Sequence, residues 1–340
     1  MRHEPELFDV RTLLDRLRVA GAKRQHENLI LRAWLAGRAL DFHRDTREHP
    51  FPRELLLALP EIESELDRAA RVVSEHDGAD GSQRLLVRLH DGQTVESVLL
   101  ERNGLCASTQ VGCAVGCVFC MTGKSGLLRQ LTSLEIVIQV ALARRRRSVK
   151  RVVFMGMGEP SHNLPAVLQA LSVLGREGGL AHKNLVFSTV GDARVFDRLA
   201  AHDVKPALAL SLHTTDAKLR AELLPRAPRV DPGELVTRAD DYARRTGHPI
   251  QYQWTLIEGV NDGDGELERL TEMMRGRHGI VNFIPYNDVD GLRYRRTSLA
   301  RARAMSQHLH QHGILCKLRR SAGQDVQGAC GQLRARHVGT

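Results

Sequence analysis

The sequence is poor in aromatic residues and contains no long apolar run. Only two Trp and four Tyr occur among its 340 residues, so a broad aromatic platform for stacking nucleic-acid bases is not expected. No apolar stretch reaches the length that crosses a membrane. The first residues are charged and lack the apolar core of a signal peptide, which predicts a cytoplasmic protein without a membrane partner.

The chain also lacks low-complexity linkers, and its only internal repetition is an alternation of strand-like and helix-like segments. A chain of this length can bury a full core, most simply as one domain of barrel size with a smaller appendage. The net charge of +9 favours a polyanionic partner, although a basic composition alone is weak support for a nucleic-acid partner.

Six cysteines are present, and three of them form a C-x-x-x-C-x-x-C array at Cys113, Cys117 and Cys120. In the cytoplasm thiols stay reduced, so such cysteines are more readily ligands or catalysts than disulfide partners. Three thiolates on one loop can each bind one iron of a [4Fe-4S] cluster and leave the fourth iron open to a substrate. A structural zinc site is the weaker alternative, because no second C-x-x-C or H-x-x-x-H pair follows at the usual distance.

The first part of the chain has a helical pattern. Apolar residues recur at helical spacing from Asp9 to about Ala70, with a break at His49-Pro-Phe-Pro52. We therefore predict a helical accessory domain over residues 1–80. Its basic exposed faces could contact a polyanionic partner, or the domain could only pack against the remainder of the chain.

Two alternating apolar runs between Arg84 and Leu100 flank the turn sequence His90-Asp-Gly-Gln93 and predict a β-hairpin extension over residues 81–104. The second run contains Glu96. A glutamate on an alternating strand usually faces solvent, so the pattern alone gives Glu96 no function.

After the cysteines, strand-like and helix-like segments alternate, which predicts a parallel sheet rolled towards a barrel over residues 105–340. In such barrels the reactive groups lie at the carboxyl ends of the strands, where several polar residues of this sequence fall. The predicted strands are 152–155, 185–188, 207–212, 250–256 and 281–284, and the predicted helices are 133–147, 164–176, 193–202, 232–245, 265–275 and 299–312.

Four short motifs follow one another from Cys106 to the end of the chain. They are the cysteine segment through Gly123 with Phe119 before its last cysteine, G-M-G-E-P at Gly156–Pro160, S-L-H at Ser211–His213, and A-C-G-Q-L at Ala329–Leu333. Together they resemble the RlmN/Cfr family of radical S-adenosylmethionine (SAM) RNA methyltransferases. The resemblance, which extends from about Glu96 to the end, implies an α/β fold with a partial (β/α)6 radical SAM barrel. It also implies a cytoplasmic monomer that is reduced by a one-electron donor such as flavodoxin.

The resemblance implies three catalytic residues. Cys330 would take a methyl group from one SAM molecule, and a second SAM molecule would supply the radical that activates this methyl group for addition to an adenine ring carbon. Glu96 would then remove the ring proton. Cys106 would attack the sulfur that joins Cys330 to the RNA, which leaves a disulfide for later reduction. The neighbouring glycines of Cys330 suit a nucleophile that must reach two partners.

The same resemblance implies the residues that bind SAM. The backbone at Gly158 would approach the methionine part of SAM, and Glu159 would hold its ammonium group. A serine or histidine at the end of a strand is more often a turn or cap residue. Only the occurrence of all four motifs in the order of the family favours a role for these residues in SAM binding. The polar contacts to SAM would come from Ser188, Ser211, Leu212, His213 and Asn287. Cys316 has apolar neighbours and is predicted to be a buried structural thiol.

Basic residues cluster at three places in the sequence. Such runs could follow a phosphate backbone without reading its sequence, although the first run could equally be a solvated helix end. The clusters are Arg144–Arg147 with Lys150 and Arg151, then Arg293, Arg295 and Arg296, and finally Arg319 with Arg320.

The sequence departs from the family pattern at Gly126–Gln130, where similar proteins usually have an aromatic residue and an asparagine, and in its divergent N-terminal region. The target therefore stays open: ribosomal RNA, transfer RNA or another RNA, at carbon 2 or carbon 8 of an adenine. Two other classes are possible. One is a radical SAM enzyme that acts on a small molecule or protein, and the other is a non-catalytic RNA-binding protein with a structural cluster.

Overall fold

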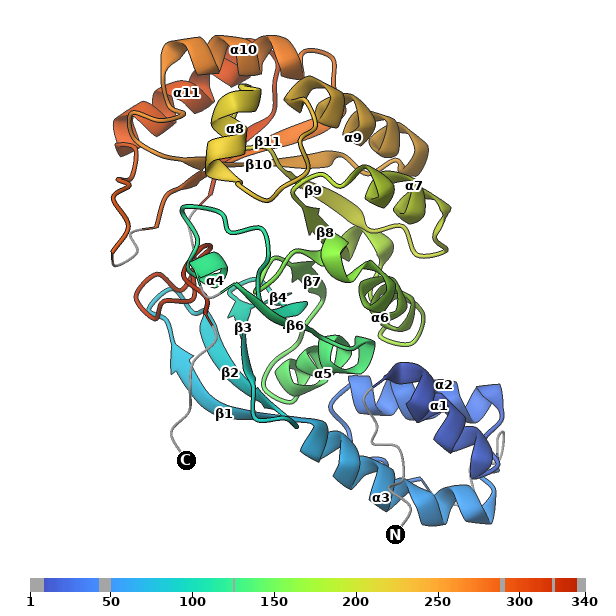
Figure 1. Ribbon diagram of the computed structural model, residues 1–340. Coiled ribbons are helices and arrows are strands. Elements are labelled where there is room, and N and C mark those ends of the chain that lie inside the picture. Colours follow the sequence, from blue (N-terminus) through green and yellow to red (C-terminus); the bar gives the residue numbers. More distant parts are fainter. Residues whose placement is uncertain (1–8, 43–49, 125, 288–290, 320–321, 335–340) are drawn as a thin grey trace.

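The computed structural model describes residues 9–42, 50–124, 126–287, 291–319 and 322–334. Within them, a ten-stranded sheet has the order β1-β2-β3-β4-β7-β8-β9-β10-β11-β12, and β5 pairs with β6 in a separate two-stranded sheet (Figure 1). His49 of the expected helix break and Arg320 of the third basic cluster lie outside the described residues, as do both chain ends.

The three N-terminal helices confirm the helical pattern predicted for this part. They are α1 (Val10–Val19), α2 (Arg24–Leu35) and α3 (Arg53–Ala69), and they form a lobe beside α5 (Figure 1). Each buries an apolar stripe, as an amphipathic helix does. The chain then continues directly into β1 (Ala70–Asp77), a strand that the sequence pattern did not predict.

The predicted hairpin is confirmed as β2 (Gln83–Leu89) and β3 (Thr94–Leu100), which pair antiparallel. It continues into the barrel, because β3 pairs with β4 (Gly104–Cys106) and β4 pairs in parallel with β7 (Arg151–Phe154).

Seven neighbouring strands, from β4 through β12, run parallel, which confirms the predicted α/β barrel. The further strands are β8 (Leu185–Thr189), β9 (Ala207–Ser211), β10 (Ile250–Leu256), β11 (Gly279–Pro285) and β12 (Cys316–Leu318). The helices are α5 (Ser133–Arg144), α6 (Leu164–Arg176), α7 (Ala193–Ala201), α8 (Ala217–Leu223), α9 (Pro232–Thr246), α10 (Asp264–Met274) and α11 (Leu299–Gln311).

The helices between the parallel strands lie on the outside of the curved sheet (Figure 1). Apolar side chains on both faces of the strands are buried, as expected for a parallel sheet covered by helices. A small inner cluster contains Val153, Val186, Ala207 and Ala209.

The sequence pattern missed β12 and α8, because segments of three and seven residues are too short to display a clear period. Cys316 on β12 is buried in the main apolar core, as predicted. No helix among the described residues has both the length and the hydrophobicity to span a bilayer.

Candidate active site

A cavity of about 160 Å³ lies at the carboxyl ends of the parallel strands. All but three of the predicted site residues border it: Cys113, Cys117, Cys120, Gly158, Glu159, Ser188, Ser211, His213, Asn287 and Cys330. The other three are Cys106, Glu96 and Leu212. A larger cleft of about 560 Å³ between α1, α2 and α6 has none of the predicted site residues in its wall.

The cysteine loop runs from β5 (Gln110–Gly112) to the short helix α4 (Met121–Lys124). Its backbone is held from outside, because Cys113 N donates to Gly126 O at 2.9 Å and Val118 N donates to Leu223 O at 3.1 Å. Gly112 has a φ of +79°, and a Cβ there would lie 2.0 Å from Gly126 O. Only glycine therefore allows the loop to begin at this point.

The three loop cysteines are free thiols that border one cavity, and this arrangement fits a [4Fe-4S] cluster. Burial raises the pKa of Cys113 to about 12 and that of Cys117 well above its ordinary value, and neighbouring thiols add to both effects. Iron would be needed to hold such thiols deprotonated. No three side chains of the described residues are spaced to chelate a single metal ion, whereas a cubane holds its thiolates on separate irons.

Glu159 follows β7, and two backbone amides hold its buried carboxylate. Ser161 N donates to Oε1 and Val190 N donates to Oε2, both at 3.1 Å. Burial raises the pKa of Glu159, so a cation bound beside it would favour the ionised form. These contacts fix the carboxylate against the cavity wall.

Gln110 orients Glu159, and the sequence reasoning missed it. Glu159 N donates to Gln110 Oε1 at 2.7 Å, and Gln110 Nε2 donates to Gln130 Oε1 at 2.9 Å. Gly158 has a φ of +102°, and a Cβ there would lie 2.6 Å from the Gln110 side chain. The only signal in the sequence was the position of the segment S-T-Q-V-G, between Cys106 and the cysteine array.

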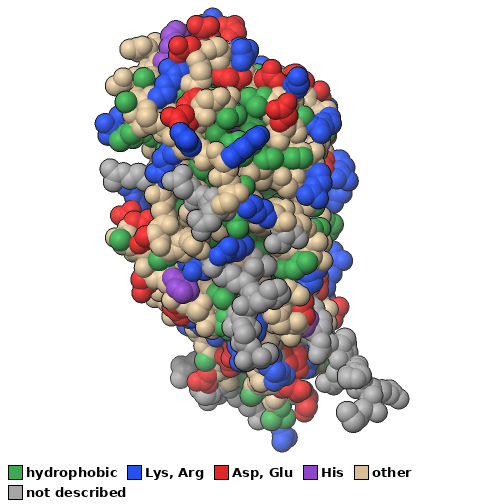
Figure 2. Space-filling view, turned by 60° about the vertical axis from the view of Figure 1, so that its left-hand side comes forward, with side chains coloured by type: hydrophobic (Ala, Val, Ile, Leu, Met, Phe, Trp, Pro, Cys, Tyr) green, Lys and Arg blue, Asp and Glu red, His purple; other side chains and the backbone are tan. Residues whose placement is uncertain are grey.

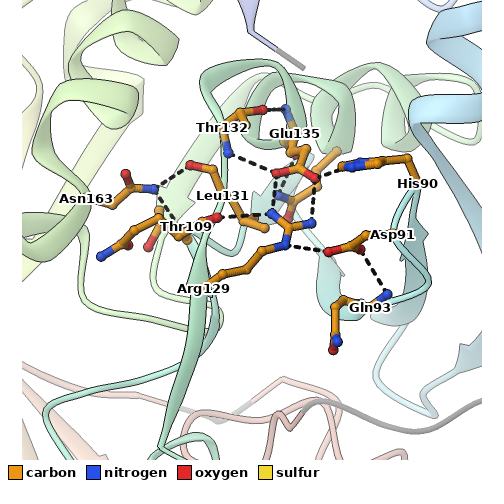
Figure 3. A network of polar contacts seen from close by, with 11 residues as sticks. His90, Asp91, Gln93, Thr109, Arg129, Leu131, Thr132, Glu135 and Asn163 are labelled. Carbon is orange, nitrogen blue, oxygen red and sulfur yellow. Dashed lines mark hydrogen bonds and ion pairs between the residues drawn. The ribbon is translucent and has the colours of Figure 1, made fainter. Parts of the chain in front are cut away.

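A polar network holds β5 and β6 (Leu127–Gln130) in place (Figure 3). Arg129 on β6 donates to both carboxylate oxygens of Glu135 at 2.8 Å and to Asp91 Oδ2 at 2.7 Å. Asn163 Nδ2 donates to Thr109 O at 2.8 Å and to Leu131 O at 2.7 Å. The small sheet that carries Gln110 is thus joined to the hairpin turn and to the start of α5.

His213 has a φ of +63° and is only 6% exposed. Its Nδ1 accepts the backbone N–H of Thr255 at 3.0 Å, so the ring proton is on Nε2. Burial lowers the pKa of His213 to about 3, with a further contribution from the charge of Arg220. The imidazole is therefore neutral near pH 7 and offers one N–H donor.

Asn261 supports the strained turn at His213 and was also missed. Its Nδ2 donates to His213 O at 2.7 Å and to Thr255 O at 2.8 Å, and its Oδ1 accepts Ile257 N at 2.8 Å. Asn261 follows the predicted strand 250–256 in G-V-N-D, which was the available signal. Leu212, in contrast, has its side chain in the apolar core, and only its backbone joins this turn.

The C-terminal segment brings Cys330 to the cavity. Asn287 Nδ2 donates to Cys330 O at 2.9 Å, and Met121 N donates to Gly331 O at 2.7 Å. Cys330 is exposed as a residue, yet the protein around its thiol raises the thiol pKa by desolvation, while Arg319 acts in the opposite direction. Cys106 is partly buried, and desolvation raises the pKa of its thiol, with the charge of Cys330 adding to this increase.

Glu96 is fully buried on β3 and does not border the cavity. Its Oε1 forms an ion pair with Arg84, and its Oε2 accepts Arg334 N at 2.9 Å. Arg84 Nε also donates to Val326 O at 2.6 Å. The residue expected to act as a base is thus paired with a cation and covered by the C-terminal segment.

The four arginines of the run 144–147 contact the protein itself. They lie at the carboxyl end of α5, and Arg145 and Arg146 are exposed, as expected for a solvated helix end, so contact of this run with RNA stays a prediction. Arg144 Nη1 donates to Leu35 O at 3.2 Å, and Arg147 Nη1 donates to Gly81 O at 2.8 Å. Arg145 pairs with Asp67 at 2.9 Å and Arg146 with Glu75 at 2.6 Å. They join the barrel to the helical lobe and to β1.

Comparisons with known proteins agree with this geometry. Residues 107–271 match the model of the radical SAM superfamily. The chain is 62% identical over 330 residues to a probable RNA methyltransferase of Methylibium petroleiphilum, across 97% of this chain and 94% of that protein. It is 61% identical over 326 residues to a probable RNA methyltransferase of an Azoarcus species, across 96% and 94%. A radical SAM methyltransferase structure from Sphaerobacter thermophilus has a TM-score of 0.83 and 34% identity, and the match covers 97% of this chain and 99% of that one.

A partial parallel barrel with three free cysteines and several strand-end polar groups around one cavity defines a radical SAM enzyme, a class that uses a [4Fe-4S] cluster and SAM. Within that superfamily, the chain belongs to the family of these two bacterial relatives, which bear the name probable RNA methyltransferase.

Proposed function

We propose that this enzyme is an RNA methyltransferase of the RlmN/Cfr type, which methylates an adenine ring carbon through a methylated Cys330. The observation that carries the proposal is that Cys330 borders the same cavity as the cysteine loop. Cys330 can therefore meet a cofactor inside the cavity and, because the residue is exposed, a large substrate outside it. The names of the relatives support RNA as that substrate.

Cys113, Cys117 and Cys120 would hold the cluster, and Glu159 would bind the ammonium group of SAM. When bound, the cluster and two SAM molecules per turnover supply a methyl group and a carbon-centred radical. Glu159 is oriented before SAM arrives, because two backbone amides hold its carboxylate. His213 would donate from Nε2 to an acceptor atom of SAM. The remaining contacts would come from Gly158, Ser188, Ser211, the backbone of Leu212, and Asn287.

Glu96 and Cys106 would release the product from a covalent Cys330–RNA intermediate. Glu96 would take the ring proton, and Cys106 would attack the sulfur, which leaves a disulfide between the two cysteines. Arg84 and the N–H of Arg334 now occupy the carboxylate of Glu96, so this step requires the C-terminal segment to shift.

The RNA is a ribosomal or transfer RNA, with carbon 2 of adenine favoured and carbon 8 as the alternative. Lys and Arg side chains, interspersed with Asp and Glu, are spread over the face in Figure 2. The net charge of +9 suits a polyanionic partner. Arg293 and Arg295 are exposed and flank Tyr294. We further propose a cytoplasmic monomer reduced by a flavodoxin-like donor, in which residues 1–80 and 81–104 are accessory to the catalytic barrel over residues 105–340.

The test is to express Cys106→Ala with ample iron and sulfide, purify it under denaturing conditions, and determine by mass spectrometry whether Cys330 carries RNA. Cys316→Ala is the matched control, since it removes a buried thiol of the main core, outside the cavity wall. We expect an RNA adduct on Cys330 in the first variant only, and sequencing of the trapped fragment names the RNA.

An unmodified Cys330 in both the variant and the wild type would contradict the proposed mechanism. The result would then favour a radical SAM enzyme that acts on another substrate. Digestion of the methylated RNA to nucleosides separates carbon 2 from carbon 8, because the two methyladenosines differ in chromatographic retention.

A further inference from the structure

Arg220 on α8 is a buried cation beside the cysteine cavity, and neither the motifs nor the proposed reaction uses it. The residue is 3% exposed. Its Nη2 donates to Val190 O at 2.5 Å and to Ser211 O at 3.1 Å. Both of these acceptor residues border the cavity together with Cys117.

Within the part of the chain that the structure describes, the two hydrogen bonds leave part of the guanidinium without a partner: Nε is buried and has no hydrogen-bond partner there. A buried unpaired donor on a charged group is costly, so its retention needs a reason. Burial lowers the pKa of Arg220 to about 10, while the charges of Cys117 and Glu159 act in the opposite direction and raise it. Arg220 therefore stays protonated near pH 7. A positive charge therefore stands beside the site of three thiolates.

The helix that carries Arg220 packs directly on the cysteine loop. Val118 N donates to Leu223 O at 3.1 Å, and Arg226 N donates to Val115 O at 3.2 Å. Helix α8, which positions the charge of Arg220, is therefore joined to the cysteine loop by backbone hydrogen bonds. Val190 links the two halves of the site, since its N–H holds Glu159 and its carbonyl holds Arg220.

We infer that Arg220 is a positioning residue whose buried charge stabilises the reduced state of the iron–sulfur cluster. A cluster core held by three thiolates carries net negative charge, and reduction adds to it. The reduction potential of such clusters depends on net charge, on hydrogen bonds and on burial. A buried cation is weakly screened, so its charge acts on the cluster more strongly than that of a surface residue. The inference rests on the proposed cluster ligands and is independent of the RNA substrate.

The test compares midpoint potentials of the reconstituted enzyme, measured by electron paramagnetic resonance during a redox titration without RNA. Arg220→Gln removes the charge and keeps one amide donor, and Arg220→Lys keeps the charge and loses the planar fork. Arg226→Gln is the matched control, because Arg226 is an exposed cation beside the same loop, with its guanidinium next to Gly116. Iron and sulfide content are measured for each protein.

We expect Arg220→Gln to shift the potential to more negative values, by more than Arg226→Gln does, while Arg220→Lys stays near the wild type. If Arg220→Gln takes up no cluster but Arg220→Lys retains one, the result supports a role for the positive charge. If neither variant retains the cluster, the inference is overturned. Equal potentials in wild type and Arg220→Gln at full iron content also overturn it. A wild-type protein that binds no cluster would instead refute the proposed function.

Discussion

At the scale of single residues, the site depends on polar groups that are buried together with their partners. His213 is held in a left-handed conformation by Asn261, and its Nδ1 is occupied by Thr255 N. Left-handed backbone costs free energy for a residue other than glycine, so the surrounding contacts must stabilise it. The result is an imidazole with one defined tautomer.

We predict that His213→Asn reduces the acid sensitivity of folding. The pKa of this histidine is about 3 in the folded protein and about 6.5 when unfolded, so between these values only the unfolded state binds the proton. The stability contributed by neutral His213 is therefore complete above about pH 6.5 and decreases below it, by about 1.4 kcal/mol per pH unit. Asn suits the left-handed backbone.

Urea unfolding of both proteins at about pH 7.5 and about pH 5.5 checks this prediction. The wild type should lose more free energy of unfolding between the two conditions than His213→Asn does. An equal loss in both proteins would contradict the assignment of a neutral, buried imidazole.

We predict that Arg84→Met destabilises the protein by about 3–5 kcal/mol, because it removes the ion pair that Arg84 forms with the fully buried carboxylate of Glu96. The double variant with Glu96→Leu should be less destabilised than the single variant, since the carboxylate of residue 96 is then no longer buried apart from Arg84. Chemical unfolding measures both. A double variant that is as unstable as Arg84→Met would mean that the bond from Arg84 to Val326 O, and not the ion pair, is the important contact.

At the scale of secondary-structure elements, the two-stranded sheet β5–β6 sets the position of the cysteine loop. The sheet is too small to be stable alone, since a two-stranded hairpin is marginal in water. Arg129 compensates by joining β6 to Glu135 at the start of α5 and to Asp91 at the hairpin turn. Paired carboxylates also raise the pKa of Arg129, so it stays charged at any pH at which the protein is folded.

We predict that Arg129→Gln lowers the free energy of unfolding by about 1.5–3 kcal/mol, the usual value for a hydrogen bond to a charged group. Amide hydrogen exchange should become faster in β5, β6 and the cysteine loop, with little change in α9 and β10 on the far side of the barrel. Arg238→Gln is the control, because it removes an exposed pair within one helix, between Arg238 and Glu234. If amide exchange in β5, β6 and the cysteine loop changes no more in Arg129→Gln than in Arg238→Gln, the network does not stabilise this part of the protein locally.

At the scale of the whole molecule, arginines of the run 144–147 join three regions that are distant in sequence. They reach the helical lobe at Leu35 and Asp67, strand β1 at Glu75, and the turn at Gly81. This charge run is therefore also a structural joint. Positive charge is also present on other surfaces, among them the one that carries Arg293 and Arg295.

We predict that the double variant Arg145→Ala/Arg146→Ala changes RNA affinity by less than about twofold, because both side chains are already paired, and stability by about 1 kcal/mol, as is usual for exposed pairs. Arg293→Ala/Arg295→Ala should weaken RNA binding and reduce the slope of log affinity against log salt concentration. Binding titrations at several salt concentrations measure both. Equal losses of RNA affinity in the two double variants would contradict the prediction that Arg293 and Arg295 contribute more to RNA binding than Arg145 and Arg146 do.

The sequence by itself determined the features that depend on local order. The spacing of the cysteine array, the alternation of strands and helices and the turn of the hairpin are short-range patterns, and each was predicted at nearly its final bounds. Because parallel strands place their carboxyl ends at one edge, the strand-end residues Glu159, Ser188 and Ser211 could be predicted to meet.

Only the tertiary structure decided which charges pair. Among the partners of Glu96 are Arg84 and the N–H of Arg334, which is 238 residues away in the chain. Arg220 lies beside the cavity through contacts with two separate strand ends. No periodicity encodes such pairs, because the identity of a long-range partner depends on how the elements pack. For the same reason the arginine run, Gln110 and Asn261 acquired their roles only once the sheet had brought their partners together.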